Sequence, residues 1–285
     1  MVKNFRTKDN LELIRDSGGI TTTDTQVTVS ETYRVGEGQL LEMGSELVLV
    51  TDFDDINRVA DIERGMFGTT AASHAENSLI VVSPRVYRSD VLGLINACLN
   101  ELYPDLYVID SGSLTYDGAV IGYELDSSVG GILRVRAQRS ATAKDWAPVG
   151  DWSFDPESDT TDFASGKSLM IRHALDRASK VRYTYIKPFS TVSVEGDDLE
   201  ATAGLQSYMV ELPYLYAMTK LMVLEEVERS QIIAAENHQR SQDVPGFLAL
   251  RTGEWYKARF DDLVKACRRR LLKEHGNPGM PGYGS

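Results

Sequence analysis

Two groups of acidic residues are the first candidates for chemistry in this chain. They are Asp52, Asp54 and Asp55, and Asp155, Glu157, Asp159 and Asp162. Carboxylates at such spacing can bind calcium, but neither group has the glycine and the final glutamate of the helix–loop–helix calcium site. Solvated acidic loops are the simpler interpretation, because exposed charge is common on protein surfaces. We therefore predict no metal site.

Histidine and cysteine, the other common ligands and catalytic groups, are sparse. The four histidines lie in unrelated contexts: His74, His173, His238 and His275. Cys98 and Cys267 each fall in an apolar helical segment, which predicts two buried, reduced thiols. The chain also lacks a phosphate-binding loop, a Gly-x-Ser-x-Gly elbow and a His-Glu-x-x-His pair. We expect no catalytic residue, no cofactor and a non-enzymatic function.

The segment from Trp146 to Phe154 is rich in aromatic residues, whose rings can stack on a sugar. In a β-sandwich such residues usually belong to the core or to an interface, and we favour that interpretation. The alternative, a carbohydrate-binding module for host recognition, depends on Trp146 and Trp152.

Residues 251–275 are basic in a chain of net charge −12, since eight lysines and arginines stand against four acidic residues. Three interpretations of this segment remain. It is a packed helix with a solvated basic face, a docking surface for an acidic partner, or a DNA-binding surface. Three adjacent arginines cannot all face one core, so Arg268, Arg269 and Arg270 are the predicted partner interface. An apolar stripe is expected to pack on a preceding helix, 208–239. It consists of Trp255, Phe260, Leu263, Val264, Cys267 and Leu271.

The composition is that of a globular protein: 285 residues, 42% hydrophobic and 25% charged. The negative charge argues against binding nucleic acid by neutralising phosphates, although DNA can still pass beside an acidic wall. No apolar run approaches the roughly 18 residues of a membrane span, and residues 1–10 lack the apolar region of a secretory signal. We expect a cytoplasmic protein at synthesis, without membrane contact.

Alternating runs of apolar and polar residues predict the strands. Runs at 26–29, 46–50, 56–64 and 78–83 indicate a small antiparallel sheet or barrel. Runs at 120–125, 131–137, 167–173 and 180–186, separated by glycine, aspartate and serine, indicate a β-sandwich. Apolar residues spaced by three and four predict helices at 87–103, 208–239 and 247–274.

The expected fold class is therefore α+β, with a helical core, an N-terminal β-sheet or hairpin module, an inserted antiparallel β-sandwich and a C-terminal helical pair. Four domains are predicted. They are a β-rich module at 1–86, a helical core from 87–105 and 205–275, the sandwich at 106–204 and a flexible tail at 276–285.

One stretch, residues 59–82, carries a recognisable pattern. An apolar run ends in Arg64-Gly65, a turn follows at Gly68-Thr69, and a second apolar run begins after His74. This predicts a hairpin whose glycines supply positive φ where the chain reverses. Arg64 and His74 are expected to flank the loop and to bind its backbone carbonyls.

The pattern Arg-Gly-x-x-Gly-Thr-x-Ala-x-x-His resembles a segment of small β-modules in the neck and tail proteins of tailed bacteriophages. The helix ending Asn100-Glu101-Leu102-Tyr103-Pro104 and the closing helical pair with Trp255 and Arg268 to Arg270 extend the likeness. On these features the chain is most similar to the head-to-tail adaptor, or connector, proteins. Simple adaptors are mostly helical, so the sandwich is expected to be an outward-facing insertion.

The resemblance implies a structural protein of the virion neck, assembled in the host cytoplasm. It implies a homo-oligomeric ring, commonly dodecameric, that joins the portal to the tail and surrounds the DNA exit channel. The implied partners are the portal protein, the stopper or tail-terminator proteins and further copies of the chain, with DNA passing through without sequence-specific binding. The alternatives are a tail or baseplate component and the carbohydrate-binding host-recognition module.

Overall fold

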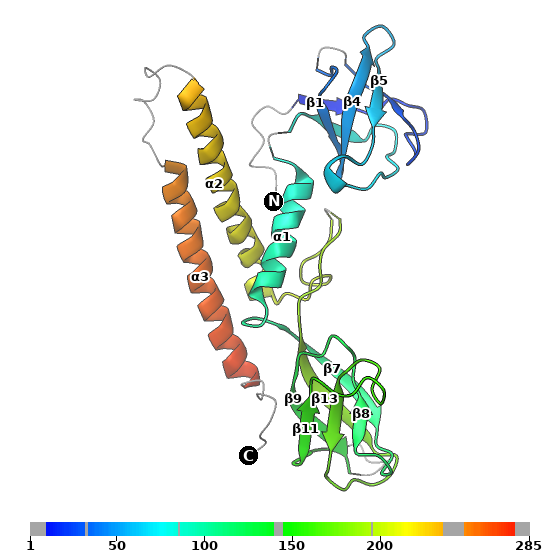
Figure 1. Cartoon of the computed structure of the whole chain (residues 1–285), viewed down its shortest axis with the longest axis vertical. Helices are drawn as coiled ribbons and strands as arrows, with labels where there is room; N and C mark the ends of the chain where they lie inside the picture. Colours follow the sequence, from blue (N-terminus) through cyan, green and yellow to red (C-terminus); the bar gives the residue numbers. More distant parts are fainter. Residues whose placement is uncertain are drawn as a thin grey trace. The chain divides into compact units, whose positions relative to one another are not determined.

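A computed structural model describes residues 10–31, 34–84, 86–139, 145–194, 196–235 and 248–276 (Figure 1). The chain divides into two compact units. One comprises Met1–Ile95 with Val192–Asp197, and the other comprises Asn96–Thr191 with Asp198–Ser285. Each unit is described by itself.

The expected α+β fold around a helical core is wrong. In the described ranges the architecture is dominated by three antiparallel sheets of six, four and three strands, accompanied by three α-helices. The expectation failed because many strands are only three or four residues long. Alternation over so few residues gives no clear periodic signal, so the sequence pattern predicts fewer strands than the structure contains.

The first unit contains the six-stranded sheet, in the order β1-β6-β3-β4-β5-β2. Its strands are β1 (Asn10–Leu13), β2 (Gln26–Thr28), β3 (Leu40–Met43), β4 (Glu46–Asp54), β5 (Val59–Glu63) and β6 (Leu79–Val82). The two edge strands meet through an Ile14–Val29 bridge, and the Arg15 N–H donates to the Thr28 carbonyl at 2.8 Å. The sheet thus closes on itself as a small barrel, which leaves its edge strands paired.

Aliphatic side chains from all six strands or their immediate extensions fill this barrel. The cluster includes Ile14, Val27, Leu41, Met43, Val48, Val50, Ala60, Ile62, Ile80 and Val82, all at most 4% exposed. The sheet-or-barrel prediction for this region is confirmed.

The predicted hairpin over residues 59–82 is wrong, although both of its strands exist. β5 pairs with β4 and β2, whereas β6 pairs with β1 and β3. The connection over residues 64–78 is too long for a tight turn, and it crosses from one side of the β3–β4 pair to the other.

Two sheets of the second unit form a sandwich. The larger has the order β10-β9-β13-β7 and the smaller the order β11-β12-β8. Their strands are β7 (Val108–Thr115), β8 (Gly122–Glu124), β9 (Gly131–Gln138), β10 (Trp146–Pro148), β11 (Trp152–Asp155), β12 (Ser168–Ile171) and β13 (Lys180–Lys187). Buried side chains of both sheets, including Val135, Val181, Phe154 and Leu169, belong to one core. This is the face-to-face packing of a β-sandwich.

The helices are α1 (Arg88–Leu102), α2 (Glu211–Ala235) and α3 (Leu248–His275), with short 3-10 turns η2 (Met66–Gly68) and η3 (Ser207–Met209). α2 and α3 are antiparallel neighbours (Figure 1). The Tyr216 and Phe260 rings lie 5.7 Å apart, and Gly253 lies against Met222. Cys98 and Cys267 are free and buried, as predicted, and burial raises the pKa of Cys98 to about 12. Most of the predicted tail, 277–285, lies outside the described residues.

Gly112 of β7 lies directly opposite Tyr183 of β13, whose ring covers it. Any Cβ at Gly112 would overlap that ring, and Tyr183 is only 9% exposed. We predict that Gly112→Val destabilises the sandwich by about 1–3 kcal/mol, because overpacking forces a buried side chain out of place. Chemical denaturation followed by the fluorescence of Trp146 and Trp152 measures this loss.

Gly150→Val is the matched control, since a Cβ there meets nothing within 4 Å. Equal destabilisation by the two substitutions would contradict the overlap explanation.

Candidate functional site

The pattern that runs from Arg64-Gly65 to His74 lies around one buried carboxylate, that of Glu46. Glu46 opens β4 directly after the β3–β4 turn, opposite Met43, and is fully buried. A carboxylate withdrawn from water is unstable unless charge and hydrogen bonds replace its hydration. The groups around Glu46 must therefore supply that charge and those hydrogen bonds.

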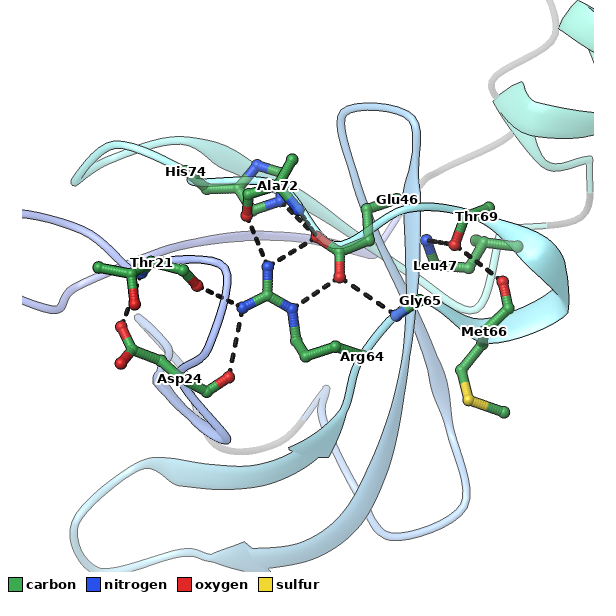
Figure 2. Close-up of polar contacts among 10 residues, drawn as sticks. All are labelled: Thr21, Asp24, Glu46, Leu47, Arg64, Gly65, Met66, Thr69, Ala72 and His74. Carbon is green, nitrogen blue, oxygen red and sulfur yellow. Dashed lines mark hydrogen bonds and ion pairs between the residues drawn. The ribbon is translucent and has the colours of Figure 1, made fainter.

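Arg64 supplies the opposing charge in a bidentate pair. Its Nε donates to Oε1 of Glu46 at 2.6 Å and its Nη2 donates to Oε2 at 2.7 Å (Figure 2). The planar guanidinium matches the two carboxylate oxygens, the strongest geometry for such a pair. Both side chains are largely withdrawn from solvent, at 9% and 0% exposure.

Three further donors complete the shell around Glu46. The backbone N–H of Gly65 donates to Oε1 at 3.3 Å, and that of Ala72 donates to Oε2 at 3.0 Å. The His74 Nε2 lies 2.8 Å from Oε2 and must carry a proton, because an ionised carboxylate only accepts. Burial alone would raise the pKa of Glu46, but hydrogen bonds from Arg64, His74 and Ala72 outweigh it and lower the pKa from 4.5 to about 2.

Arg64 is as completely satisfied as its partner. Its Nη1 donates to the carbonyls of Thr21 and Asp24 at 2.7 and 3.3 Å, and its Nη2 donates to that of Ala72 at 2.6 Å (Figure 2). With the two bonds to Glu46, all five guanidinium N–H groups are used. Arg64 thus binds one carbonyl of its own loop, that of Ala72, as expected, but its other two carbonyl partners lie before β2, and the His74 ring binds the carboxylate instead of a carbonyl.

The remaining residues of the pattern shape the loop. Gly65 and Gly68 have φ of 67° and 80°, a region that favours glycine, as the sequence predicted. The Thr69 hydroxyl donates to the Met66 carbonyl at 2.8 Å and accepts from the Leu47 N–H at 3.1 Å. The loop is thereby fastened to β4 at both ends of the η2 turn.

One large apolar side chain of this loop faces solvent. Phe67 is 77% exposed and has φ of 54°, a left-handed conformation that costs energy for a non-glycine residue. Sequence reasoning missed both Phe67 and Glu46. The signal for Glu46 was an acidic residue at the start of an apolar strand, which is too common to stand out.

The hydrogen-bonding groups of Glu46 and Arg64 are used within the barrel. Glu46 is saturated with donors and Arg64 has no N–H left for a ligand. Nowhere in the described ranges do three or more histidine, cysteine, aspartate or glutamate side chains converge to hold a metal ion. None of the described helices is long and apolar enough to cross a membrane.

The two acidic groups that were considered as calcium ligands stabilise the turns in which they lie. Asp54 accepts from the backbone N–H groups of Ile56 and Asn57, and Asp159 accepts from that of Thr161. Trp146 lies under the Arg182 guanidinium, 4.9 Å from ring centre to Cζ, and Trp152 packs against the sandwich core.

The three arginines of α3 are not brought together on one surface. Arg268 pairs with Asp105 at 2.9 Å, and Arg270 pairs with Glu274 at 2.8 Å while lying over the Tyr208 ring. Arg269 is exposed. Within the predicted apolar stripe Cys267 and Leu271 are buried, but Trp255 is 62% exposed, so its predicted packing is wrong.

Comparison with known protein families and with curated proteins returns no match for this chain. The geometry of the described residues therefore carries the functional argument.

Glu46→Gln should destabilise the barrel by about 3–5 kcal/mol, because it leaves the buried Arg64 without its counter-charge. The whole chain has three tryptophans, at 146, 152 and 255, so fluorescence does not report on the barrel. Amide hydrogen exchange of peptides from residues 10–84 measures the loss. Glu63→Gln, at an exposed position of β5, is the control and should change little.

The same pair predicts a dependence on pH. The pKa of Glu46 is lower in the folded barrel, about 2, than its ordinary value of 4.5, so its stabilisation is full above pH 4.5 and is lost as the pH falls toward 2. The difference in barrel stability between wild type and Glu46→Gln should therefore shrink over that interval. A difference that stays constant down to about pH 2 would show that the pKa of Glu46 is not lowered in the folded barrel.

Proposed function

We propose that this protein is a non-enzymatic structural subunit of a tailed-phage virion, a ring-forming head-to-tail adaptor between portal and tail. The observation that carries the proposal is the structural role of the residues in the phage-like pattern. Arg64, Gly65, Thr69 and His74 all serve to hold one loop, and that loop exposes Phe67. Such a device presents an apolar contact residue and uses the charges of Glu46 and Arg64 within the barrel.

The exposed aromatic ring is suited to a protein interface. Aromatic residues, phenylalanine included, are enriched at such interfaces, and a side chain held rigidly before binding loses less entropy on binding. Phe67 meets both conditions, since Gly65 and Thr69 fix the backbone on either side of it. We assign it as a contact residue toward a neighbouring virion protein.

The host-recognition alternative receives less support. It needs Trp146 and Trp152 to offer their faces to a glycan. Arg182 lies over Trp146 and the sandwich core takes up Trp152. No described feature of the sandwich favours a sugar over a structural role for these rings.

The test is the mass of the protein in solution with and without purified portal rings of the same phage. An adaptor is expected to be monomeric or weakly associated alone and to add many copies to each portal ring, seen by analytical ultracentrifugation. A stable trimer that does not bind portal rings but binds host cells would overturn the proposal.

Phe67→Ser should weaken binding to the neighbouring virion protein at least tenfold and leave barrel stability nearly unchanged, because the ring is already in water. Val120→Ser, at a 48% exposed position of the sandwich, is the control. If the Phe67→Ser variant bound its partner as tightly as the wild type does, the loop would not belong to the interface.

A further inference from the structure

The outer face of the larger sandwich sheet carries a row of cationic side chains. Val135 of β9 and Val181 of β13 belong to the sandwich core, so the residues next to them in sequence point to the opposite face, because side chains alternate along a strand. Four of these neighbours are cations, and all four are exposed: Arg134, Arg136, Lys180 and Arg182. We name these four residues the cationic row.

Two members of the cationic row lie directly across from each other. β9 and β13 are neighbours in the sheet (Figure 1), and their register places Arg182 opposite Arg136. Directly opposite positions bring the Cβ atoms to about 5 Å, and like charges placed there destabilise a sheet. An anion that accepts hydrogen bonds from both guanidinium groups would remove this repulsion.

The sheet supplies no such anion itself. None of the four side chains forms an ion pair or a hydrogen bond with another residue that the structure describes. Three acidic residues lie in the strands of this sheet or within two residues of them, and each has a basic partner at 3.3 Å or less. These pairs are Asp110–Lys187, Asp117–Arg177 and Asp145–Arg139. The cationic row therefore keeps its charge in a chain of net charge −12.

One arginine of the row is held in place before any ligand binds. The Arg182 guanidinium lies over the Trp146 ring, with 4.9 Å between Cζ and the ring centre. A guanidinium stacked in this way keeps its N–H groups available, because they point outward in its own plane. This preorganisation lowers the entropy cost of binding an anion.

Strand β7 adds hydroxyl groups to the same face. Ser111, Ser113 and Thr115 are exposed, and Ser113 lies directly opposite Arg182 of β13. Arginine, lysine, serine and threonine side chains are common donors to the phosphate oxygens of nucleic acids. The residue types of this face thus fit a chain of phosphate groups.

The face does not have the composition of a protein interface. None of the exposed large hydrophobic side chains among the described residues lies on β7, β9, β10 or β13. The buried centre of a protein interface is apolar and depleted of charged residues, whereas interfaces with DNA are more polar and much more positively charged. Trp146 is only partly exposed and carries Arg182, so it is not an open platform for an unpaired base. The phosphates of a duplex, whose bases stay stacked, match this face best.

We propose that the cationic row binds the phosphate backbone of double-stranded DNA without reading its sequence. Arg136 and Arg182 hold one phosphate between them, and Arg134 and Lys180 each contact a further one. The row extends over about 14 Å along the strands, a length in which one strand of B-DNA carries about four phosphates. The face selects a duplex backbone, and that the duplex is DNA rests on the proposed function.

The contact is local. The acidic remainder of the chain repels DNA, so the negative net charge confines binding to this face and does not exclude it. The sandwich must then face the DNA, contrary to the outward-facing insertion that the resemblance implies.

The salt dependence of DNA binding tests the proposal. Fluorescence anisotropy of a labelled duplex of about 30 base pairs, titrated with the full chain, should give a slope of about −2.7 for log Kobs against log salt concentration, as expected for three phosphate contacts. The triple variant Arg134→Gln, Arg136→Gln, Lys180→Gln should bind at least tenfold more weakly at low salt, with a slope of about −0.9 from the remaining Arg182 contact. Its sandwich should be at least as stable as that of the wild type, because the substitutions remove like charges.

A control triple variant carries the same change of charge away from the face. It consists of Arg172→Gln, which follows β12, and Arg251→Gln and Lys257→Gln on α3, all at exposed positions. This variant should bind DNA as the wild type does. If it loses as much affinity as the first triple variant, binding does not belong to the cationic row and the proposal is overturned.

Other polyanions separate the possible ligands. Single-stranded DNA, duplex RNA, heparin and phosphatidylserine vesicles are compared with duplex DNA at the same salt concentration. Duplex DNA should bind most tightly, and tighter binding of any other ligand would overturn the assignment of duplex DNA. Failure to bind duplex DNA even at low salt would overturn the proposal as a whole.

Binding to portal rings is measured separately, and the first triple variant should retain it. If the wild type bound DNA but no portal ring, the proposed function would be wrong and the DNA-binding face would remain. If it bound portal rings but no DNA, only the present inference would be overturned.

Discussion

The bidentate pair of Arg64 and Glu46 is the interaction on which the barrel depends. Two opposite charges lie where water does not reach, and each would be costly alone. The cost is offset because five donors surround Glu46 and all five N–H groups of Arg64 are used. Arg64 reaches the carbonyls of Thr21, Asp24 and Ala72, so one side chain joins the segment before β2, the start of β4 and the loop after β5. Aliphatic contacts alone could not fix these segments in register, because they have no direction.

The same device recurs in the barrel. Glu12 of β1 and Glu42 of β3 are also buried, at 1% and 3% exposure. Glu12 accepts from Ser30 and from the Glu31 N–H and lies 3.7 Å from Arg34, and Glu42 accepts from the Arg88 N–H and lies 3.5 Å from its guanidinium. Arg88 opens α1, so the second pair binds a helix start to the sheet. Each buried glutamate of this barrel thus has an arginine from a distant segment beside it, and these pairs specify which segments meet.

The sequence predicted those elements whose signal is local. In β13 the alternation places Val181 and Tyr183 in the core and Lys180 and Arg182 in solvent, as the pattern indicated. It could not show which strands pair: β5 and β6 follow each other in sequence but are separated by β3 and β4 in the sheet. Strands as short as β10 and β11 carry too few residues for a period. The sequence indicated the glycines and Arg64 of the loop, but not the carboxylate that organises them, because Glu46 is identified as a partner only by long-range folding.

Three of the exposed apolar side chains stand on backbone that local contacts hold in place. Phe67, Ile56 and Trp255 are not scattered on loose loops. Phe67 lies on a turn fastened by Gly65 and Thr69, Ile56 on a turn capped by Asp54, and Trp255 on a helix where its ring stands against Tyr256. A side chain that is fixed before binding loses less entropy when a partner covers it, which lowers one of the costs of association. The buried pair of Glu46 and Arg64 holds the loop of Phe67, whereas the exposed Asp54 caps the turn of Ile56 and α3 carries Trp255, so three different local structures fix these side chains.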